Sequence, residues 1–264
     1  MVARPPTEEM ATDRSGPLTD LALTLPIFVG YHLGVIFLPV RNAADLLTRE
    51  LQAVANYNLM AYLALTLAIG AGYVAPLLLA GRGKHLKAQR FAWMSTEGVV
   101  YALGMRLLAG YFVARLVLAL GPVDFGFIGL MNAAPALSSV VEQAGASATL
   151  SERVAGAVMS LGAGFYEEAV FRVGLYGLGA ALLLFLFNVT SAAKKFVLRL
   201  VWGTLAACVF SGWHYVGDLS DAFDLSTFSF RAICGLAFTL IYQFRGFAPA
   251  VWTHALYDLW VLSF

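Results

Sequence analysis

The chain has 264 residues, of which 60% are hydrophobic and only 12% are charged, and its mean hydropathy is +0.76. Soluble domains contain about 45–50% apolar and about 25% charged residues, so this composition excludes an ordinary soluble protein. The net charge of +1 gives no basis for nucleic-acid binding. Apolar runs of about 20 residues predict an all-α, polytopic transmembrane helical bundle embedded in a lipid bilayer.

The apolar runs predict about seven spans. The fourth run, residues 151–188, is too long for one straight span, and we expect an approach helix, a break near Gly162 or Gly164, and then the span itself. If this run instead makes two spans, the total becomes eight. The predicted spans are residues 18–40, 54–80, part of 91–120, 151–188, 197–216, 230–244 and 247–264.

Three regions divide the chain. Residues 1–17 are polar and contain Pro5-Pro6, and they are expected to form a disordered polar tail. Residues 18–150 are an N-terminal three-span region that ends in a Gly/Pro/Ser/Ala-rich connection, Gly121–Leu150. Residues 151–264 are the helical core that carries the motifs described below.

The loops predict which end of the bundle faces the cytoplasm. Lys and Arg in the loops set the orientation of a membrane protein, with the excess on the cytoplasmic side. With a cytoplasmic N-terminus and seven spans, ten basic residues lie inside and four lie outside. The four outside are Arg41, Arg49, Arg153 and Arg231. We therefore expect a cytoplasmic N-terminus and place the Lys194-Lys195 loop in the cytoplasm.

The fourth predicted span carries two adjacent carboxylates and an arginine, Glu167, Glu168 and Arg172. Ionisable groups in hydrocarbon cost several kcal/mol each, so such residues are usually functional or tightly paired. On a helix, Glu168 and Arg172 are spaced i, i+4 and can form an ion pair. Glu167 points about 100° away from that pair. The spacing therefore predicts one neutralised carboxylate and one available carboxylate.

Two further motifs that contain polar residues lie in later spans: Phe210 with His214, and His254 with Asp258. Each has a structural alternative, because a single membrane histidine often bonds a neighbouring helix and a His/Asp pair at i, i+4 is often a structural ion pair. Polar sites on three spans must all avoid lipid, and they do so at least cost by meeting in the interior of one bundle.

The order Glu-Glu-x-x-x-Arg, Phe-x-x-x-His, His-x-x-x-Asn/Asp on successive spans resembles the CPBP family of intramembrane endopeptidases, which includes type II CAAX prenyl proteases and bacterial Abi members. This chain has Asp258 where many relatives have Asn. The resemblance covers roughly Val154 to the C-terminus. It implies a catalytic CPBP-like core over residues 151–264, in a bacterial inner membrane. It also implies hydrolysis of a peptide bond in a membrane-anchored protein or peptide.

The resemblance assigns a role to each motif residue. Glu167 would be the base that activates water, and His214 would help to hold that water. His254 with Asp258 would face the oxyanion. Since an ionised aspartate cannot donate a hydrogen bond, Asp258 is expected to be protonated or, as we favour, to orient His254 by accepting from its imidazole. Three residues would support this site structurally: Glu168, Arg172 and Phe210.

The need for a metal stays open. Glu167, His214 and His254 would compose a zinc site as the alternative. The chain lacks a His-Glu-x-x-His motif, and Arg172 would compete with a cation for Glu168, so we favour a mechanism without a cofactor.

Two other classes of function compete with the protease. The first is a non-enzymatic membrane immunity or scaffold protein of the same fold, which would not need all the motif positions intact. The second is a transporter that uses the carboxylates and histidines as a proton relay. Such transporters often contain paired internal repeats, and none is visible here.

Overall fold

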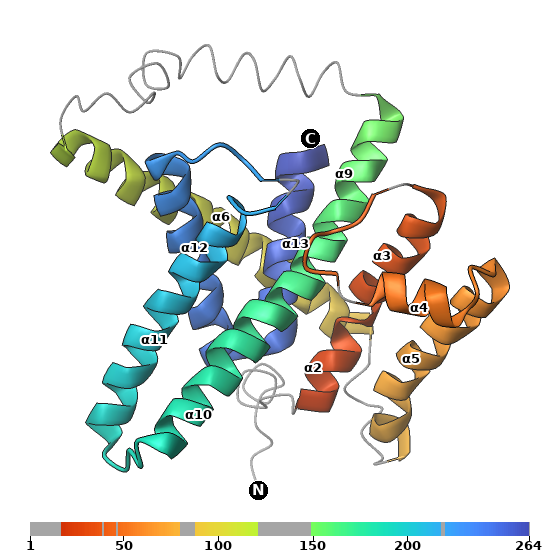
Figure 1. Cartoon of the computed structure of the whole chain (residues 1–264), viewed down its shortest axis with the longest axis horizontal. Coiled ribbons are helices and arrows are strands. Elements are labelled where there is room, and N and C mark those ends of the chain that lie inside the picture. The colour runs from red at the N-terminus through yellow and green to blue at the C-terminus, as the bar shows by residue number, and fades with distance from the viewer. Residues whose placement is uncertain are drawn as a thin grey trace, which may run out of the picture.

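The computed structural model describes residues 17–38, 40–45, 47–79, 88–120, 149–217 and 220–263, and within them all regular secondary structure is helical (Figure 1). The predictions for the tail 1–17 and for the connection Gly121–Leu150 fall almost wholly outside these residues. The helices are α2 (Pro17–Leu23), α3 (Leu25–Phe37), α4 (Thr48–Val54), α5 (Leu59–Leu79), α6 (Ala88–Leu120), α9 (Leu150–Gly162), η2 (Ala163–Leu178), α10 (Gly179–Leu186), α11 (Ala192–Trp213), α12 (Leu225–Arg245) and α13 (Phe247–Ser263).

Within the described residues, five helical segments are long and apolar enough to cross a bilayer, so the protein is an integral membrane protein. They are Leu59–Pro76, Ala88–Leu116, Leu150–Leu186, Ala192–Trp213 and Leu225–Arg245. The expectation of seven spans is therefore not confirmed. The first predicted span divides at Thr24, because α3 begins anew there with Pro26 in its first turn. Proline lacks a backbone N–H and favours the start of a helix.

The expected break near Gly162 or Gly164 is wrong. The chain stays helical from Leu150 to Leu186, so this segment is not divided in two as the eight-span alternative required. Instead, the hydrogen-bond pattern changes after Gly162, and Ala163–Leu178 form a π-helix. π-Helical turns are rare in proteins, and those that do occur often lie at functional sites. This stretch carries Glu167, Glu168 and Arg172.

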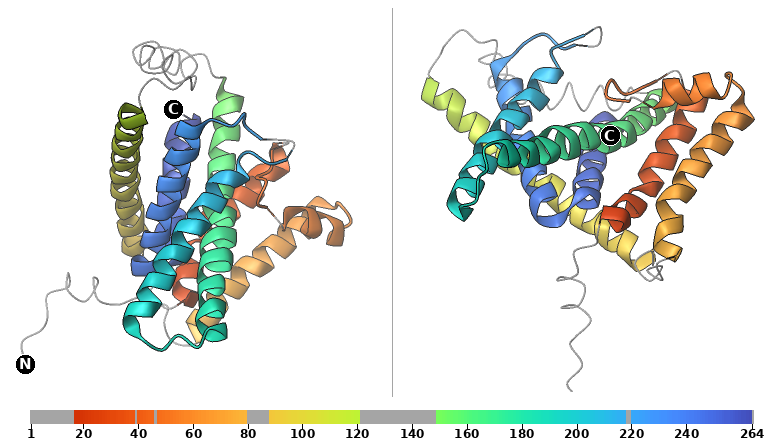
Figure 2. Two further views of the ribbon diagram at one scale, coloured as in Figure 1. Left: turned by 60° about the vertical axis from the view of Figure 1, so that its left-hand side comes forward. Right: turned by 60° about the horizontal axis from the view of Figure 1, so that its bottom comes forward.

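Helix α13 lies at the centre of the bundle. It packs against α6, α9, η2 and α12, while α11 packs against α12 (Figures 1 and 2). The N-terminal helix α3 packs on α9 and α5. The α10–α11 turn and the α11–α12 connection lie at opposite ends of the bundle, because α11 runs from one end to the other (Figure 1).

Gly164 allows η2 and α13 to approach closely. A Cβ atom at Gly164 would lie 2.6 Å from the Cβ and 2.8 Å from the backbone nitrogen of Ala255, so a side chain there would push α13 away. This contact brings the backbone that precedes Glu167 beside the backbone that carries His254. The glycine therefore sets the distance between two of the predicted site residues.

Candidate active site

Glu168 and Arg172 form the predicted i, i+4 ion pair, with Oε1 of Glu168 3.0 Å from a guanidinium nitrogen of Arg172. Both side chains are almost fully buried, at 0% and 1% exposure. The same Oε1 lies 2.7 Å from Nδ1 of His254. A carboxylate only accepts hydrogen bonds, so Nδ1 of His254 is the donor. Glu168 thus fixes the orientation of His254 in addition to holding Arg172.

Arg172 is surrounded by aromatic rings as well as by its carboxylate. Its guanidinium carbon lies 4.2 Å from the ring centre of Phe210 and 4.9 Å from that of Phe238, and a nitrogen donates to the carbonyl oxygen of Gly235 at 3.3 Å. Cation–π contacts stabilise a desolvated guanidinium. Phe210 and Phe238 therefore surround the buried charge with aromatic rings.

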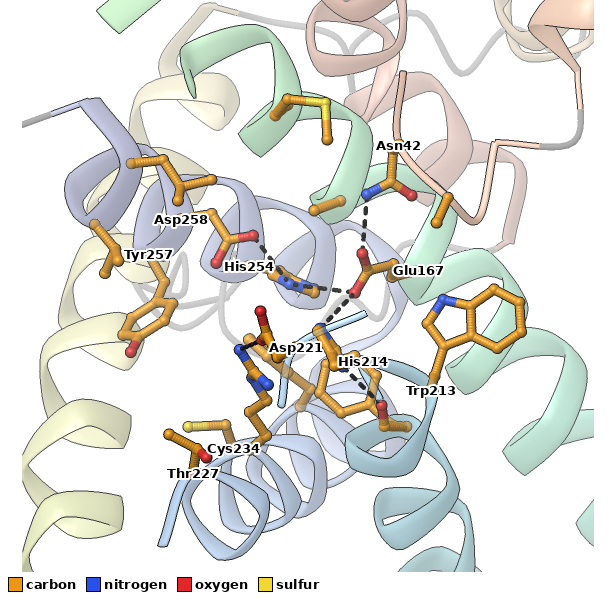
Figure 3. A pocket seen from close by; sticks show the side chains of 18 of the residues that line it. Asn42, Glu167, Trp213, His214, Asp221, Thr227, Cys234, His254, Tyr257 and Asp258 are labelled. Atoms are coloured by element: carbon orange, nitrogen blue, oxygen red, sulfur yellow. Dashed lines mark hydrogen bonds and ion pairs between the residues drawn. The ribbon is translucent and has the colours of Figure 1, made fainter. Parts of the chain in front are cut away.

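Glu167 points toward Asn42, His214 and His254 at the cavity (Figure 3). Its Oε1 accepts a hydrogen bond from Nδ2 of Asn42 at 2.9 Å. Its Oε2 is buried and has no hydrogen-bond partner among the described residues. This oxygen lies 4.0 Å from Nε2 of His214 and 3.9 Å from Nε2 of His254. The structure therefore brings Glu167 and both predicted histidines together.

His214 follows the last residue of α11, and its ring is held by the helix itself. Nδ1 donates to the carbonyl oxygen of Phe210 at 3.0 Å, and the two rings meet edge to face at 5.2 Å between centres. Nε2, the other ring nitrogen, faces Oε2 of Glu167 at 4.0 Å. The Phe-x-x-x-His spacing thus lets Phe210 hold the ring of His214 through its carbonyl oxygen and its own ring.

Asp258 lies next to His254, as the i, i+4 spacing predicted, but not as its closest partner. The distance from Oδ2 of Asp258 to Nε2 of His254 is 3.4 Å, against 2.7 Å from Glu168 to Nδ1. The ring of His254 also stacks on the ring of Phe238, with 4.5 Å between ring centres and 20° between planes. Glu168 and Phe238 therefore orient this imidazole more closely than Asp258 does.

The four predicted catalytic side chains face one cavity of about 840 Å³ (Figure 3). Its wall is mostly apolar and is built by α9, η2, α11, α12, α13, the α11–α12 connection and the loop after α3. The residues that line it include Asn42, Met159, Glu167, Phe210, Trp213, His214, Gly217, Asp221, Thr227, Phe230, Arg231, Cys234, Phe238, His254, Tyr257, Asp258 and Leu262.

Polar groups of the α11–α12 connection stand at one end of this cavity. Arg231 pairs with Asp221 at 2.6 Å, and Asp224 caps α12 by accepting from the backbone of Thr227 at 2.8 Å. Partial burial raises the pKa of Asp224, but hydrogen bonds from Ser226 and Thr227 outweigh that effect and lower the pKa below its usual value. The cap therefore stays ionised and keeps the start of α12 in place.

The side chains do not fit the zinc alternative. Ligands about 2.1 Å from a tetrahedral zinc ion lie roughly 3.4 Å from one another, whereas Oε2 of Glu167 is 3.9 and 4.0 Å from the two histidine nitrogens. In the described part of the chain, no group of three or more His, Cys, Asp or Glu side chains is arranged to hold a metal ion. We therefore derive no step through a metal.

Sequence reasoning missed two residues of the site. Asn42 comes from the N-terminal region, which contains no recognised motif, and its only signal was a polar side chain just after the first predicted span. Phe238 was one aromatic residue among many in an apolar helix, and nothing in the sequence distinguished it.

A comparison with protein families supports the resemblance. The family described as "Type II CAAX prenyl endopeptidase Rce1-like" matches residues 149–260. This segment contains every motif residue named above. Searches of curated proteins and of solved structures found no significant match.

Proposed function

Since residues 149–260 form a domain of the Rce1-like type II CAAX prenyl endopeptidase family, we propose that this protein is an intramembrane endopeptidase that cleaves a membrane-anchored protein or peptide. One observation carries the proposal. Oε2 of Glu167 is buried, has no partner among the described side chains, and faces Nε2 of both His214 and His254 at 4.0 and 3.9 Å. This arrangement suits a general base with two groups beside it.

The spacing favours a bound water as the nucleophile. The separations of 3.9 and 4.0 Å are too long for direct hydrogen bonds, but one water molecule can bridge such a pair with hydrogen bonds of about 2.8 Å. Glu167 would take a proton from this water as its oxygen attacks the peptide carbonyl carbon. His214 would hold the water through Nε2, because its Nδ1 hydrogen is already donated to Phe210.

His254 is placed to stabilise the oxyanion that forms on the carbonyl oxygen. When doubly protonated, it donates Nδ1–H to Glu168 and presents Nε2–H to the cavity. Donors fixed in advance toward a developing charge lower the barrier, because they need no reorganisation during the reaction. The proton held by Glu167 would then pass to the leaving nitrogen as the carbon–nitrogen bond breaks.

The apolar wall of the cavity suits a substrate that is cleaved in an apolar segment close to the substrate's membrane anchor. Aromatic and aliphatic side chains from α11, α12 and α13 surround the polar cluster, and Phe210, Trp213, Phe230, Phe238, Val261 and Leu262 all line the cavity. Binding pockets in proteins usually have a mostly apolar wall and a few convergent polar groups.

Cleavage of native membrane proteins tests the proposal. The purified protein would be incubated with a solubilised membrane proteome, and new C-termini would be identified by mass spectrometry. Glu167→Gln is the matched control, because glutamine keeps the shape and a carbonyl oxygen for Asn42 but cannot act as the base. New C-termini with the wild type alone are expected. No new C-termini with the wild type would overturn the proposal and favour the non-enzymatic immunity or scaffold alternative.

A further inference from the structure

We propose that Asn42 is a positioning residue for the catalytic carboxylate, so that the active site is completed by the N-terminal region. This inference rests on the proposed function of Glu167. Asn42 lies in the loop between α3 and α4, more than one hundred positions before residues 149–260, which match the protease family. Nothing in that family match requires a side chain from this loop.

The hydrogen bonds of Asn42 define which of its side-chain atoms faces Glu167. Its Oδ1 accepts from the backbone nitrogen of Ala44 at 2.8 Å. The amide nitrogen Nδ2 is therefore turned to the other side, where it donates to Oε1 of Glu167 at 2.9 Å. The side chain of Asn42 is only 5% exposed, so this hydrogen bond is buried. The orientation of the amide is fixed from both ends.

The loop that carries Asn42 is itself tied to the bundle. The hydroxyl of Tyr31 accepts from the backbone nitrogen of Asn42 at 3.1 Å and donates to Oδ2 of Asp45 at 2.7 Å. Oδ1 of Asp45 accepts from the backbone nitrogens of Leu47 and Thr48, at the start of α4. Buried polar groups that are satisfied in this way hold one conformation.

Gly162 permits the loop to reach the catalytic helix. A Cβ atom there would lie 2.5 Å from the ring of Tyr31 and 3.1 Å from the Cβ of Asn42. Any side chain at this position would displace both residues from the helix. The glycine one turn before Glu167 therefore makes room for the Asn42 contact.

The contact gives the two carboxylate oxygens of Glu167 different neighbours. Asn42 occupies Oε1 and fixes the rotation of the carboxylate, which leaves Oε2 directed at His214 and His254 (Figure 3). Without this donor, the carboxylate can rotate and the distance from Oε2 to the histidines is no longer fixed. The expected consequence is a slower chemical step with unchanged substrate binding, because Asn42 acts through Glu167.

The test compares Asn42→Asp and Asn42→Ala with the wild type, using a peptide made from a cleavage site identified in the proteome experiment. Asn42→Asp keeps the acceptor for Ala44 but replaces the donor with an oxygen. The matched control is Asn58→Asp, an exposed asparagine of the same region whose Oδ1 accepts from the backbone of Ala61 at 3.0 Å, a bond that aspartate also makes. We expect kcat to fall about 10- to 100-fold in both Asn42 variants with KM unchanged, as for loss of a hydrogen bond to a charged group. Asn58→Asp should match the wild type.

The pH profile separates a positioning role from a structural one. At low pH, the carboxyl introduced by Asn42→Asp becomes protonated and can again donate to Glu167. The ratio of its kcat to the wild-type kcat at the same pH should therefore rise toward one as pH falls. Asn42→Ala should show no such recovery. The titratable or charged groups around the pair are unchanged in all variants, and they include Tyr31, Asp45, Arg172, His214 and His254.

Three results would overturn the inference. The first is a folded Asn42→Ala or Asn42→Asp protein with wild-type kcat. The second is a loss of activity that follows a fall in melting temperature and is equal at every pH. The third is a wild-type protein that cleaves nothing, which overturns the proposed function as well. Wild-type cleavage that Glu167→Gln abolishes, combined with full activity of the Asn42 variants, removes this inference alone.

Discussion

Glu168 lies closer to the imidazole of His254 than Asp258 does, although Asp258 is the nearer residue in the sequence. Oε1 of Glu168 is 2.7 Å from Nδ1 of His254, across 86 positions of the chain. The same oxygen is 3.0 Å from Arg172. This carboxylate therefore connects the buried cation to the imidazole that faces Glu167. The second glutamate of the motif acts on the geometry of the site as well as on the stability of the helix.

The first prediction compares the two carboxylates beside His254. Glu168→Gln should lower kcat about 10- to 100-fold, because it removes a short charged hydrogen bond and leaves Arg172 without its counter-ion. Asp258→Asn should stay within about tenfold of the wild type, since Asp258 is 3.4 Å away and asparagine keeps an oxygen there. Cleavage kinetics of the two purified variants measure the difference. Equal losses would show that Asp258 orients His254.

The second prediction concerns the buried arginine. Arg172→Ala should lower the free energy of unfolding by about 3–5 kcal/mol, because Glu168 would remain buried without its partner. Arg245→Ala is the matched control, since Arg245 is 42% exposed and its pair with Glu97 should contribute only about 0–1 kcal/mol. Thermal or denaturant unfolding in detergent measures both. An Arg172→Ala protein as stable as Arg245→Ala would contradict the expectation.

Local spacing was enough to predict the contacts inside one helix. The pair Glu168–Arg172 and the neighbours His254 and Asp258 are set by i, i+4 geometry, and the structure contains both. The available carboxylate of Glu167 followed from the same helical angle. These contacts depend on a separation of four residues along one helix and not on how helices meet.

Contacts between helices could not be predicted in the same way. The Asn42–Glu167 hydrogen bond spans 125 positions and depends on where the loop after α3 docks. A break was expected near Gly162 or Gly164, where the structure instead begins a π-helix from Ala163 to Leu178. Glycines mark either a break or a close approach between helices, and the sequence does not distinguish the two. Gly164 serves close approach to Ala255.

The third prediction is that removal of metal leaves cleavage intact. The distances from Oε2 of Glu167 to the two histidines exceed those of a tetrahedral zinc site, and Glu167 already binds Asn42 through Oε1. Cleavage should therefore continue at the wild-type rate after treatment with a membrane-permeant chelator and removal of the chelated metal. Loss of activity that added zinc restores would show that the cluster rearranges around a metal.

The last prediction concerns the side of the membrane to which the cavity opens. Helix α11 has 22 residues, or about 33 Å at 1.5 Å per residue, which crosses a hydrocarbon core of about 30 Å. Lys194 and Lys195 stand at its start, whereas His214, Gly217 and Asp221 line the cavity at its far end. Because the excess of basic residues predicts that Lys194 and Lys195 are cytoplasmic, we expect the cavity to open on the opposite, non-cytoplasmic face.

Cysteine labelling in intact cells decides this orientation. Ser191 and Ser220 are both exposed and stand at opposite ends of α11, so Ser191→Cys and Ser220→Cys are matched variants, with the parent protein as the control for Cys208 and Cys234. An impermeant maleimide should label Ser220→Cys from outside and should label Ser191→Cys only after the membrane is opened. The reverse pattern would place the cavity on the cytoplasmic face and would show that the count of basic residues misassigns the orientation.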